Sequence, residues 1–261
     1  MGIVNVTPDS FSDGGRFLDA GAAAGHALRL IAEGADMLDI GGESTRPRAE
    51  PVSQDQEIAR VVPVIEAVRR QSGIPISVDT MKPAVARAAI AAGATMWNDV
   101  TALGWSPESL PAAAALGCEV ALMHMQGEPR TMQAAPRYGD VVAEVAGFLA
   151  ARAEAAMAAG VAREKIWIDP GIGFGKTAKH SLALLRALDR IVALGFPVLL
   201  GASRKSAIAG IAGDRSREHQ RLGGSLAVAL AAARAGVAAL RVHDVAETVQ
   251  ALAVARAIGD G

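Results

Sequence analysis

Several short apolar runs of the sequence end in polar side chains that could bind a flat heterocycle. Asp79, Asn98 and Asp169 each lie at the end of such a run. A carboxylate can accept two parallel N–H bonds, so an aspartate can hold the edge of an amino-pyrimidinone ring as it holds a guanidinium group. We therefore expect these three side chains to bind a heterocycle that is rich in N–H donors.

Other runs end in cations and in small hydrogen-bonding side chains. The cations are Arg46, Arg204, Lys205, Arg241 and His243, and the small side chains are Asn5, Thr45 and Ser203. Cationic donors bind phosphate oxygens strongly. Together with the acceptors above, they predict a ligand with a donor-rich head and a phosphorylated, anionic tail.

The residues around these groups predict alternating strands and helices. Eight short runs are apolar on consecutive positions, as is typical of parallel strands buried on both faces. The runs are 3–6, 37–40, 74–78, 95–97, 120–123, 166–168, 198–200 and 238–242. The longer segments between them have a helical period. One of these helices starts at Ser53 and Gln56, which fit a capping box, and Pro63 predicts a kink within it.

Eight strand-then-helix units in 261 residues favour an α/β fold with a single (β/α)8 TIM barrel domain over 1–261. The active site of such a barrel lies where the strands end, which is where the polar groups fall. An isolated aspartate after a strand is usually a helix cap. Caps alone do not explain a polar group at the end of all eight strands.

Two other motifs are interpreted as structural. The glycine-rich segment from Gly171 to Lys176 resembles a P-loop, but three residues separate Gly171 from Gly175, where the P-loop pattern has four. His124 lies between two methionines at a strand end, and we expect a buried structural role for it.

Composition excludes several classes of function. The chain has 26 Lys and Arg against 27 Asp and Glu, a net charge of −1, which does not fit a nucleic-acid-binding surface. A single cysteine, Cys118, excludes an internal disulfide and a CxxC zinc site, so we expect a cytoplasmic protein. The most apolar stretch, 222–240, contains Arg234, and we expect no membrane association.

The order of these motifs resembles the dihydropteroate synthase family over nearly the whole chain. The two longest matches are GIVNVTPDSFSDGG at 2–15 and DIGGESTRP at 39–47. Shorter matches follow at 77–80, 98–99, 122–127, 169–176, 201–206 and 241–244. The resemblance implies the synthesis of 7,8-dihydropteroate and diphosphate from 6-hydroxymethyl-7,8-dihydropterin diphosphate and para-aminobenzoate, with Mg2+ as cofactor.

The resemblance also implies a role for each matching residue. It implies that Asp79, Asn98, Asp169 and Lys205 hold the pterin and are the catalytic residues. It implies that Asn5, Arg241 and His243 hold the diphosphate and the metal, with Asn5 as metal ligand. Residues around the para-aminobenzoate site match Phe11, Asp13, Thr45, Arg46, Phe174, Lys205 and Ser206. Sulfonamides are expected to compete at that site, and a homodimer is expected, to which helix 225–233 offers an apolar face.

Two other functions remain open on the sequence alone. A pterin-dependent methyltransferase shares the barrel and the aspartate–asparagine set, but it does not need Arg204, Lys205 or the pair Arg241 and His243. A catalytically silent pterin-binding module would be expected to have lost some of the loop residues. The chain also lacks the residues that precede the first strand in most family members, and we expect this to affect stability more than chemistry.

Overall fold

The computed structural model describes residues 1–6, 16–44, 50–128, 131–213, 217 and 220–259, with the backbone alone at 16–19. The elements in chain order are β1 (Gly2–Asn5), α1 (Arg16–Ala32), β2 (Leu38–Gly41), α2 (Gln54–Arg69), β3 (Ile76–Asp79), α3 (Pro83–Ala91), β4 (Met96–Asp99), α4 (Ser109–Leu116), β5 (Glu119–Met123), α5 (Val141–Ala158), a 3-10 helix (Arg163–Lys165), β6 (Ile166–Asp169), α6 (Ala178–Arg186), α7 (Leu188–Val192), β7 (Leu199–Leu200), α8 (Ser206–Ala212), α9 (Leu222–Arg234), β8 (Ala239–Leu240) and α10 (Val245–Gly259).

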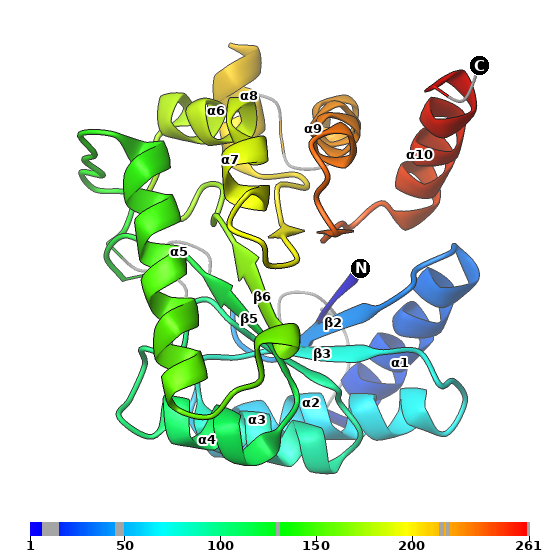
Figure 1. Ribbon diagram of the computed structural model, residues 1–261. Helices are drawn as coiled ribbons and strands as arrows, with labels where there is room; N and C mark the ends of the chain where they lie inside the picture. Colours follow the sequence, from blue (N-terminus) through cyan, green and yellow to red (C-terminus); the bar gives the residue numbers. More distant parts are fainter. Residues whose placement is uncertain (7–15, 45–49, 129–130, 214–216, 218–219, 260–261) are drawn as a thin grey trace.

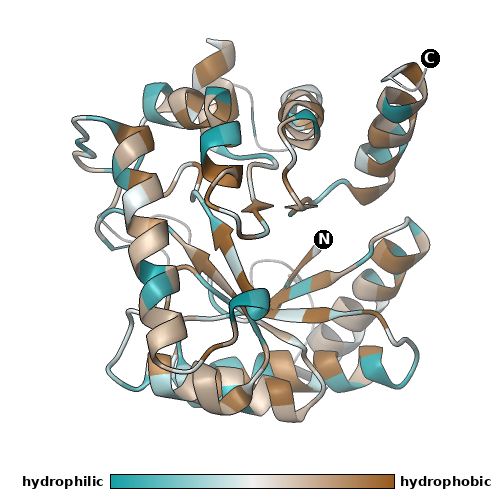
Figure 2. Ribbon diagram, viewed as in Figure 1, coloured by the Kyte–Doolittle hydropathy of each residue, from teal (hydrophilic) through white to brown (hydrophobic). Residues whose placement is uncertain are grey.

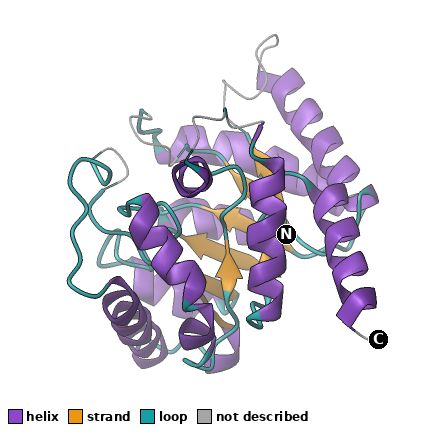
Figure 3. Ribbon diagram, turned by 90° about the horizontal axis from the view of Figure 1, so that it is seen from above, coloured by secondary structure: helices purple, strands orange, loops and turns teal. Residues whose placement is uncertain are grey.

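The described residues contain eight parallel strands, which form two sheets. β1 to β6 pair in chain order, and β7 pairs with β8. Two isolated parallel bridges join these sheets, one between Ile168 and Val198 and one between Gly2 and Val242. The strands occupy the centre and the helices surround them (Figure 1; Figure 3). The predicted (β/α)8 barrel is confirmed.

Several strands end one or two residues later than the apolar pattern predicts. Asp79, Asp99 and Asp169 are the last residues of β3, β4 and β6. The backbone of a polar residue pairs in a ladder as well as that of an apolar one, so hydropathy underestimates the length of these strands. In the register, Asp79 lies opposite Gly41 on one side and Asn98 on the other. The ladder therefore places two candidate site residues directly beside each other.

Apolar side chains from the strands and helices form the core. Figure 2 shows the hydrophobic residues of the strands in brown. Trp97 on β4 is fully buried, and its indole N–H donates to the carbonyl of Thr80 at 2.7 Å. Because that bond lies directly after Asp79, it fixes the end of β3. Cys118 is buried.

The helices follow their sequence signals with one difference. Ser53 and Gln56 form the predicted capping box of α2, and the helix continues through Pro63. Apolar residues at helical spacing over 184–192 predict one helix there, but the structure has two, α6 and α7, because Ala187 leaves helical geometry at φ −115° and ψ 29°. Within the described ranges, no helix is long and apolar enough to cross a membrane.

Candidate functional site

Two carboxylates, an amide and a guanidinium meet at the carboxyl ends of β2, β3, β4 and β8. Arg241 donates from Nε to Asp39 Oδ2 at 2.5 Å and from Nη2 to Asp79 Oδ2 at 2.9 Å. Asn98 donates from Nδ2 to both oxygens of Asp39 at 3.4 Å. Asp39 is fully buried and the Arg241 side chain is 18% exposed. The strand ends thus bring Asp79 and Asn98 together, as predicted, but Arg241, which the sequence assigns to the anionic part of the ligand, is paired with Asp39 and Asp79.

The charges in this cluster depend on one another. Burial, and after it the negative charge of Asp39, raise the pKa of the Asp79 carboxyl to about 7, against the opposing charge of Arg241. Burial alone would lower the pKa of the Arg241 guanidinium, but Asp39 and Asp79 raise it above its ordinary value. Arg241 is therefore a permanent cation, whereas Asp79 can exchange a proton near neutral pH.

Asp169, Lys205 and Phe174 form a second group beside the first. The backbone N–H of Gly171 donates to Asp169 Oδ1 at 2.7 Å, and Lys205 Nζ donates to the carbonyl of Ile172 at 2.7 Å. The Lys205 ammonium also lies 4.5 Å from the centre of the Phe174 ring, a cation–π distance. All three side chains are held by one segment, the β6–α6 loop (residues 170–177).

Burial shifts both ionisable groups of this set toward neutrality. It raises the pKa of the Asp169 carboxyl, against the opposing charge of Lys205. It lowers the pKa of the Lys205 ammonium to about 8, against the opposing charge of Asp169. Lys205 and Arg241 flank Gly201, where an added Cβ would lie 3.7 Å from Lys205 Nζ and from Arg241 Cδ. The two groups are therefore parts of one site.

The residues after β7 and β8 supply the cationic side of the rim. His243 contacts Ser203 Oγ twice, through its backbone N–H at 3.2 Å and through Nδ1 at 3.1 Å. Arg204, which the sequence groups with the phosphate-binding cations, instead forms an ion pair with Asp244, with Nε 2.9 Å from Oδ2. Arg204 thus links the loops after β7 and β8.

The remaining predicted residues divide into two sets. Asn5 is the last residue of β1, and Ser206 is the exposed first residue of α8. Four predicted residues lie outside the described residues: Phe11, Asp13, Thr45 and Arg46. Among the residues that the structure places, no three His, Cys, Asp or Glu side chains form a metal-binding group.

Sequence reasoning gave no role to Asp39, which lies in the centre of the charge cluster. The available signal was a carboxylate in the middle of an apolar run, between Leu38 and Ile40. A charge at such a position is almost never fully buried without a partner. That partner, Arg241, is distant in sequence, so pattern reading alone could not find the pair.

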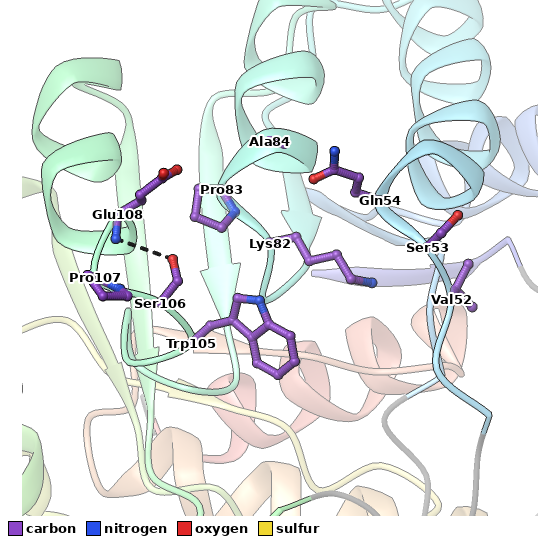
Figure 4. A pocket seen from close by; sticks show the side chains of 10 residues that line it. All are labelled: Val52, Ser53, Gln54, Lys82, Pro83, Ala84, Trp105, Ser106, Pro107 and Glu108. Atoms are coloured by element: carbon purple, nitrogen blue, oxygen red, sulfur yellow. Dashed lines mark hydrogen bonds between the residues drawn. The ribbon is translucent and has the colours of Figure 1, made fainter.

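A separate cavity of about 540 Å3 lies at the same end of the barrel, between the first turns of α2, α3 and α4 (Figure 4). Its lining comprises Val52, Ser53, Gln54, Lys82, Pro83, Ala84, Trp105, Ser106, Pro107 and Glu108. Lys82 is already paired with Glu43 at 2.7 Å and with Glu57 at 2.6 Å. None of the predicted site residues lines this cavity.

The fold and the site define a class of protein: a (β/α)8 barrel whose strands carry buried carboxylates and an amide beside a cationic rim. Residues 1–243 match the family described as pterin binding enzyme. The chain is 48% identical to the dihydropteroate synthase of Escherichia coli K12 over 257 residues, which are 98% of this chain and 90% of that protein. The chain belongs to the dihydropteroate synthase family of pterin-binding enzymes.

Solved structures give the same result. A Xanthomonas albilineans dihydropteroate synthase with 4-aminobenzoic acid superposes with a TM-score of 0.93 at 54% identity, covering 99% of this chain and 92% of that one. A structure of the same enzyme with 7,8-dihydropteroate has a TM-score of 0.90 at 51% identity, with the same coverage. A Yersinia pestis enzyme with a sulfonamide drug has a TM-score of 0.93 at 44% identity, covering all of this chain and 94% of that one.

Proposed function

We propose that the chain is the transferase that condenses 6-hydroxymethyl-7,8-dihydropterin diphosphate with para-aminobenzoate, giving 7,8-dihydropteroate and diphosphate in folate biosynthesis. The observation that carries the proposal is the convergence of Asp79, Asn98, Asp169 and Lys205 at the strand ends, with Arg241 beside them. The relatives with 4-aminobenzoic acid and with 7,8-dihydropteroate bound support the same reaction.

The acceptors bind the pterin ring. Asp79, Asn98 and Asp169 offer the carboxylate and amide oxygens that an amino-pyrimidinone edge requires. Asp169 is 5% exposed, so its charge is little screened by water. Lys205 supplies the donor to a ring oxygen or nitrogen. These four are proposed as the catalytic residues because they contact the reacting pterin.

The reaction needs stabilisation of two opposite charges. The nitrogen of para-aminobenzoate attacks the pterin methylene carbon, and the bond from that carbon to the diphosphate oxygen breaks with its electrons on diphosphate. Asp169 stabilises positive character on the methylene, and Arg241 and His243 stabilise the leaving group. The aniline nitrogen gives up a proton to solvent, and no strong base is required.

Mg2+ is proposed as the cofactor, held by Asn5 at the end of β1. Mg2+ commonly binds through one or two protein oxygens together with substrate phosphates and water. The amide oxygen of Asn5, the last residue of β1, is a ligand of this kind. When bound, the ion supplies charge neutralisation to the leaving diphosphate.

The second substrate is proposed to bind beside Phe174 and Ser206. Phe174 offers a ring face next to Lys205, and Ser206 is exposed at the start of α8. Phe11, Asp13, Thr45 and Arg46 complete this part of the site in the proposal. Sulfonamides should compete with para-aminobenzoate there.

The test is an assay of the purified chain with pterin diphosphate, para-aminobenzoate and Mg2+, following dihydropteroate and diphosphate together. Formation of both in equal amounts, with loss of both on chelation of Mg2+, is expected. Pterin binding without turnover would favour a silent module. Methyl transfer from a methylated pterin would favour a methyltransferase.

A homodimer in the cytoplasm is also proposed. Large apolar side chains are exposed on α10, with Val254 54% and Ile258 77% exposed, next to α9. Apolar surface of this kind supports an interface between copies. The cytoplasm is proposed from the lone cysteine. Sedimentation velocity at micromolar concentration tests the dimer.

A further inference from the structure

Lys176 is a buried lysine that the reaction above does not use. The residue is 3% exposed, and no carboxylate lies within ion-pair distance of its ammonium among the described residues. Its Nζ instead has four hydrogen-bond partners, two from His124 and two from the β6–α6 loop. They are His124 Nδ1 at 2.9 Å, His124 O at 3.2 Å, Gly171 O at 3.0 Å and Phe174 O at 3.0 Å.

This hydrogen-bond set joins two elements that are distant in sequence. His124 directly follows β5, and Lys176 lies near the end of the β6–α6 loop. Burial, and after it the charge of Lys176, lower the pKa of the His124 imidazole to about 3. The ring is therefore neutral, and Nδ1 acts as the acceptor for Lys176.

The loop packs backbone against backbone at the same place. An added Cβ at Gly171 would lie 1.9 Å from the carbonyl oxygen of His124, and one at Gly175 would lie 2.2 Å from that of Gln126. Both glycines also have positive φ, 65° and 60°. Such close approach leaves no room for a side chain at these two positions. Side chains hold the loop instead through hydrogen bonds to its carbonyl groups. Tyr138 Oη donates to Gly175 O at 2.9 Å and Gln133 Nε2 donates to Gly173 O, while the buried Lys176 ammonium binds Gly171 O and Phe174 O from within the loop.

The attached loop positions the site residues. The N–H of Gly171 contacts Asp169, and the carbonyl of Ile172 fixes Lys205. The ring of Phe174 lies against Lys205, while the carbonyl of the same residue accepts from Lys176. A movement of this loop would displace Phe174 most, because its ring contacts Lys205 and its backbone carbonyl accepts from Lys176.

We propose that Lys176 is a positioning residue, whose ammonium fastens the β6–α6 loop to the end of β5 and thereby orients Phe174 and Lys205 for the second substrate. The kinetic part of this inference rests on the proposed function. A lysine that served only overall stability would lower the melting temperature without changing loop motion or the balance between KM and kcat.

The experiment compares Lys176→Met with Lys179→Met, an exposed lysine of α6, as control. Amide hydrogen exchange of residues 170–177 in the substrate-free proteins is expected to rise about tenfold or more in Lys176→Met alone. The KM for para-aminobenzoate should rise about tenfold, with a smaller change in kcat. In a double-mutant cycle with Phe174→Leu, the two effects should be markedly less than additive.

Unchanged exchange in 170–177 of a folded Lys176→Met protein would overturn the proposal, whatever the activity. An inactive wild type would contradict the proposed function and leave the exchange result to decide on Lys176. If Lys176→Met does not fold, His124→Leu and His124→Asn replace it. The Asn side chain keeps an acceptor near the position of Nδ1, so only the Leu variant should show faster exchange, and equal behaviour of the two would overturn the proposal.

Discussion

Arg241 neutralises two carboxylates that would otherwise repel each other at the buried end of the barrel. Its guanidinium donates to Asp39 and Asp79, from β2 and β3. Removing one partner from a buried ion pair costs more than the pair contributes, because an uncompensated charge remains. In the proposed reaction, the substrate diphosphate therefore either displaces Arg241 from these carboxylates or binds Arg241 while both carboxylates remain paired with it.

Asp169→Asn tests the charge opposite the reacting methylene. The variant keeps the shape and one acceptor but loses the negative charge and the second acceptor. We expect kcat/KM to fall by about 2–4 kcal/mol in transition-state free energy, as for other single electrostatic stabilisers. Steady-state kinetics on a protein of unchanged melting temperature checks this. An unchanged kcat/KM would remove Asp169 from the site.

Asp99 predicts a pH dependence of stability. Its carboxylate accepts the N–H groups of Thr101 and Leu103 and the Thr101 hydroxyl. Burial nevertheless raises the pKa of this carboxyl from 3.8 to about 6. Between those pH values the folded state holds a proton that the unfolded state has lost. Its contribution to stability therefore falls as pH rises from about 4 to about 6, by at most about 1.4 kcal/mol per pH unit.

Denaturant unfolding of wild type and Asp99→Asn from pH 4 to 7 measures this effect. The other titrating groups contribute equally to both proteins, so their effect cancels in the difference between the two free energies of unfolding. The altered hydrogen bonds of the variant change that difference by a constant amount, which does not affect its dependence on pH. The stability of wild type relative to the variant should fall with pH up to about 6 and then level. A difference that is flat across the range would show that Asp99 ionises normally.

At the scale of the element, α2 offers a cap that can be removed alone. Ser53 Oγ accepts from the N–H of Gln56 at 3.3 Å, and Gln56 Oε1 accepts from the N–H of Ser53 at 3.3 Å. Ser53→Ala should lower the free energy of unfolding by about 1 kcal/mol, because a first-turn N–H loses its partner. Gln54→Ala, exposed in the same turn, is the control. Equal losses in the two variants would contradict the capping role.

The strands show how far the sequence predicts the fold. All eight were located, because buried parallel strands are apolar on consecutive residues. The apolar pattern ends β3, β4 and β6 too early, since Asp79, Asp99 and Asp169 pair through backbone atoms that hydropathy does not register. The break at Ala187 was missed, because nothing in its residue type interrupts a helix.

The site was less predictable than the strands. The residue types of Asp79, Asn98 and Asp169 and their place after strands predicted a shared rim. The partner of Arg241 was not predictable, because an ion pair across the barrel depends on which strands close the ring. The contact between Lys176 and His124 was not predictable either, because it depends on how the β6–α6 loop folds back against the end of β5.

At the scale of the whole molecule, the barrel is unequal around its ring. β1 to β6 have four or five residues each, whereas β7 and β8 have two. Single bridges at Ile168–Val198 and Gly2–Val242 join the short pair to the rest. Fewer ladder bonds mean a lower free energy of local opening. The segment 199–259, which carries Lys205, Arg241 and His243, should therefore open more readily than β1 to β6.

Substrate diphosphate should hold segment 199–259 against β1 to β6, and the two substrates should therefore bind in a fixed order. Arg241 and His243 come from the region of β8, whereas the pterin acceptors Asp79 and Asn98 come from β3 and β4. One ligand that contacts both stabilises the closed ring, by about 2.7 kcal/mol at a hundred times its Kd. Para-aminobenzoate in the proposed mode lies beside Ser206 and Lys205 of this segment but contacts none of the pterin acceptors on β3 and β4, so it does not join the two parts of the ring. It should bind weakly until pterin diphosphate and Mg2+ are present.

Amide exchange of 199–259, followed with each ligand alone and with both, measures this coupling alongside calorimetric titration of para-aminobenzoate. Pterin diphosphate with Mg2+ should slow exchange in this segment and tighten para-aminobenzoate, whereas para-aminobenzoate alone should do neither. Arg241→Ala should abolish the gain, and His243→Ala, which leaves Asp39 and Asp79 unaffected, should reduce it without the cost of unpaired carboxylates. Tight binding of para-aminobenzoate to the ligand-free protein, with slowed exchange in 199–259, would show that the anion does not organise the second site.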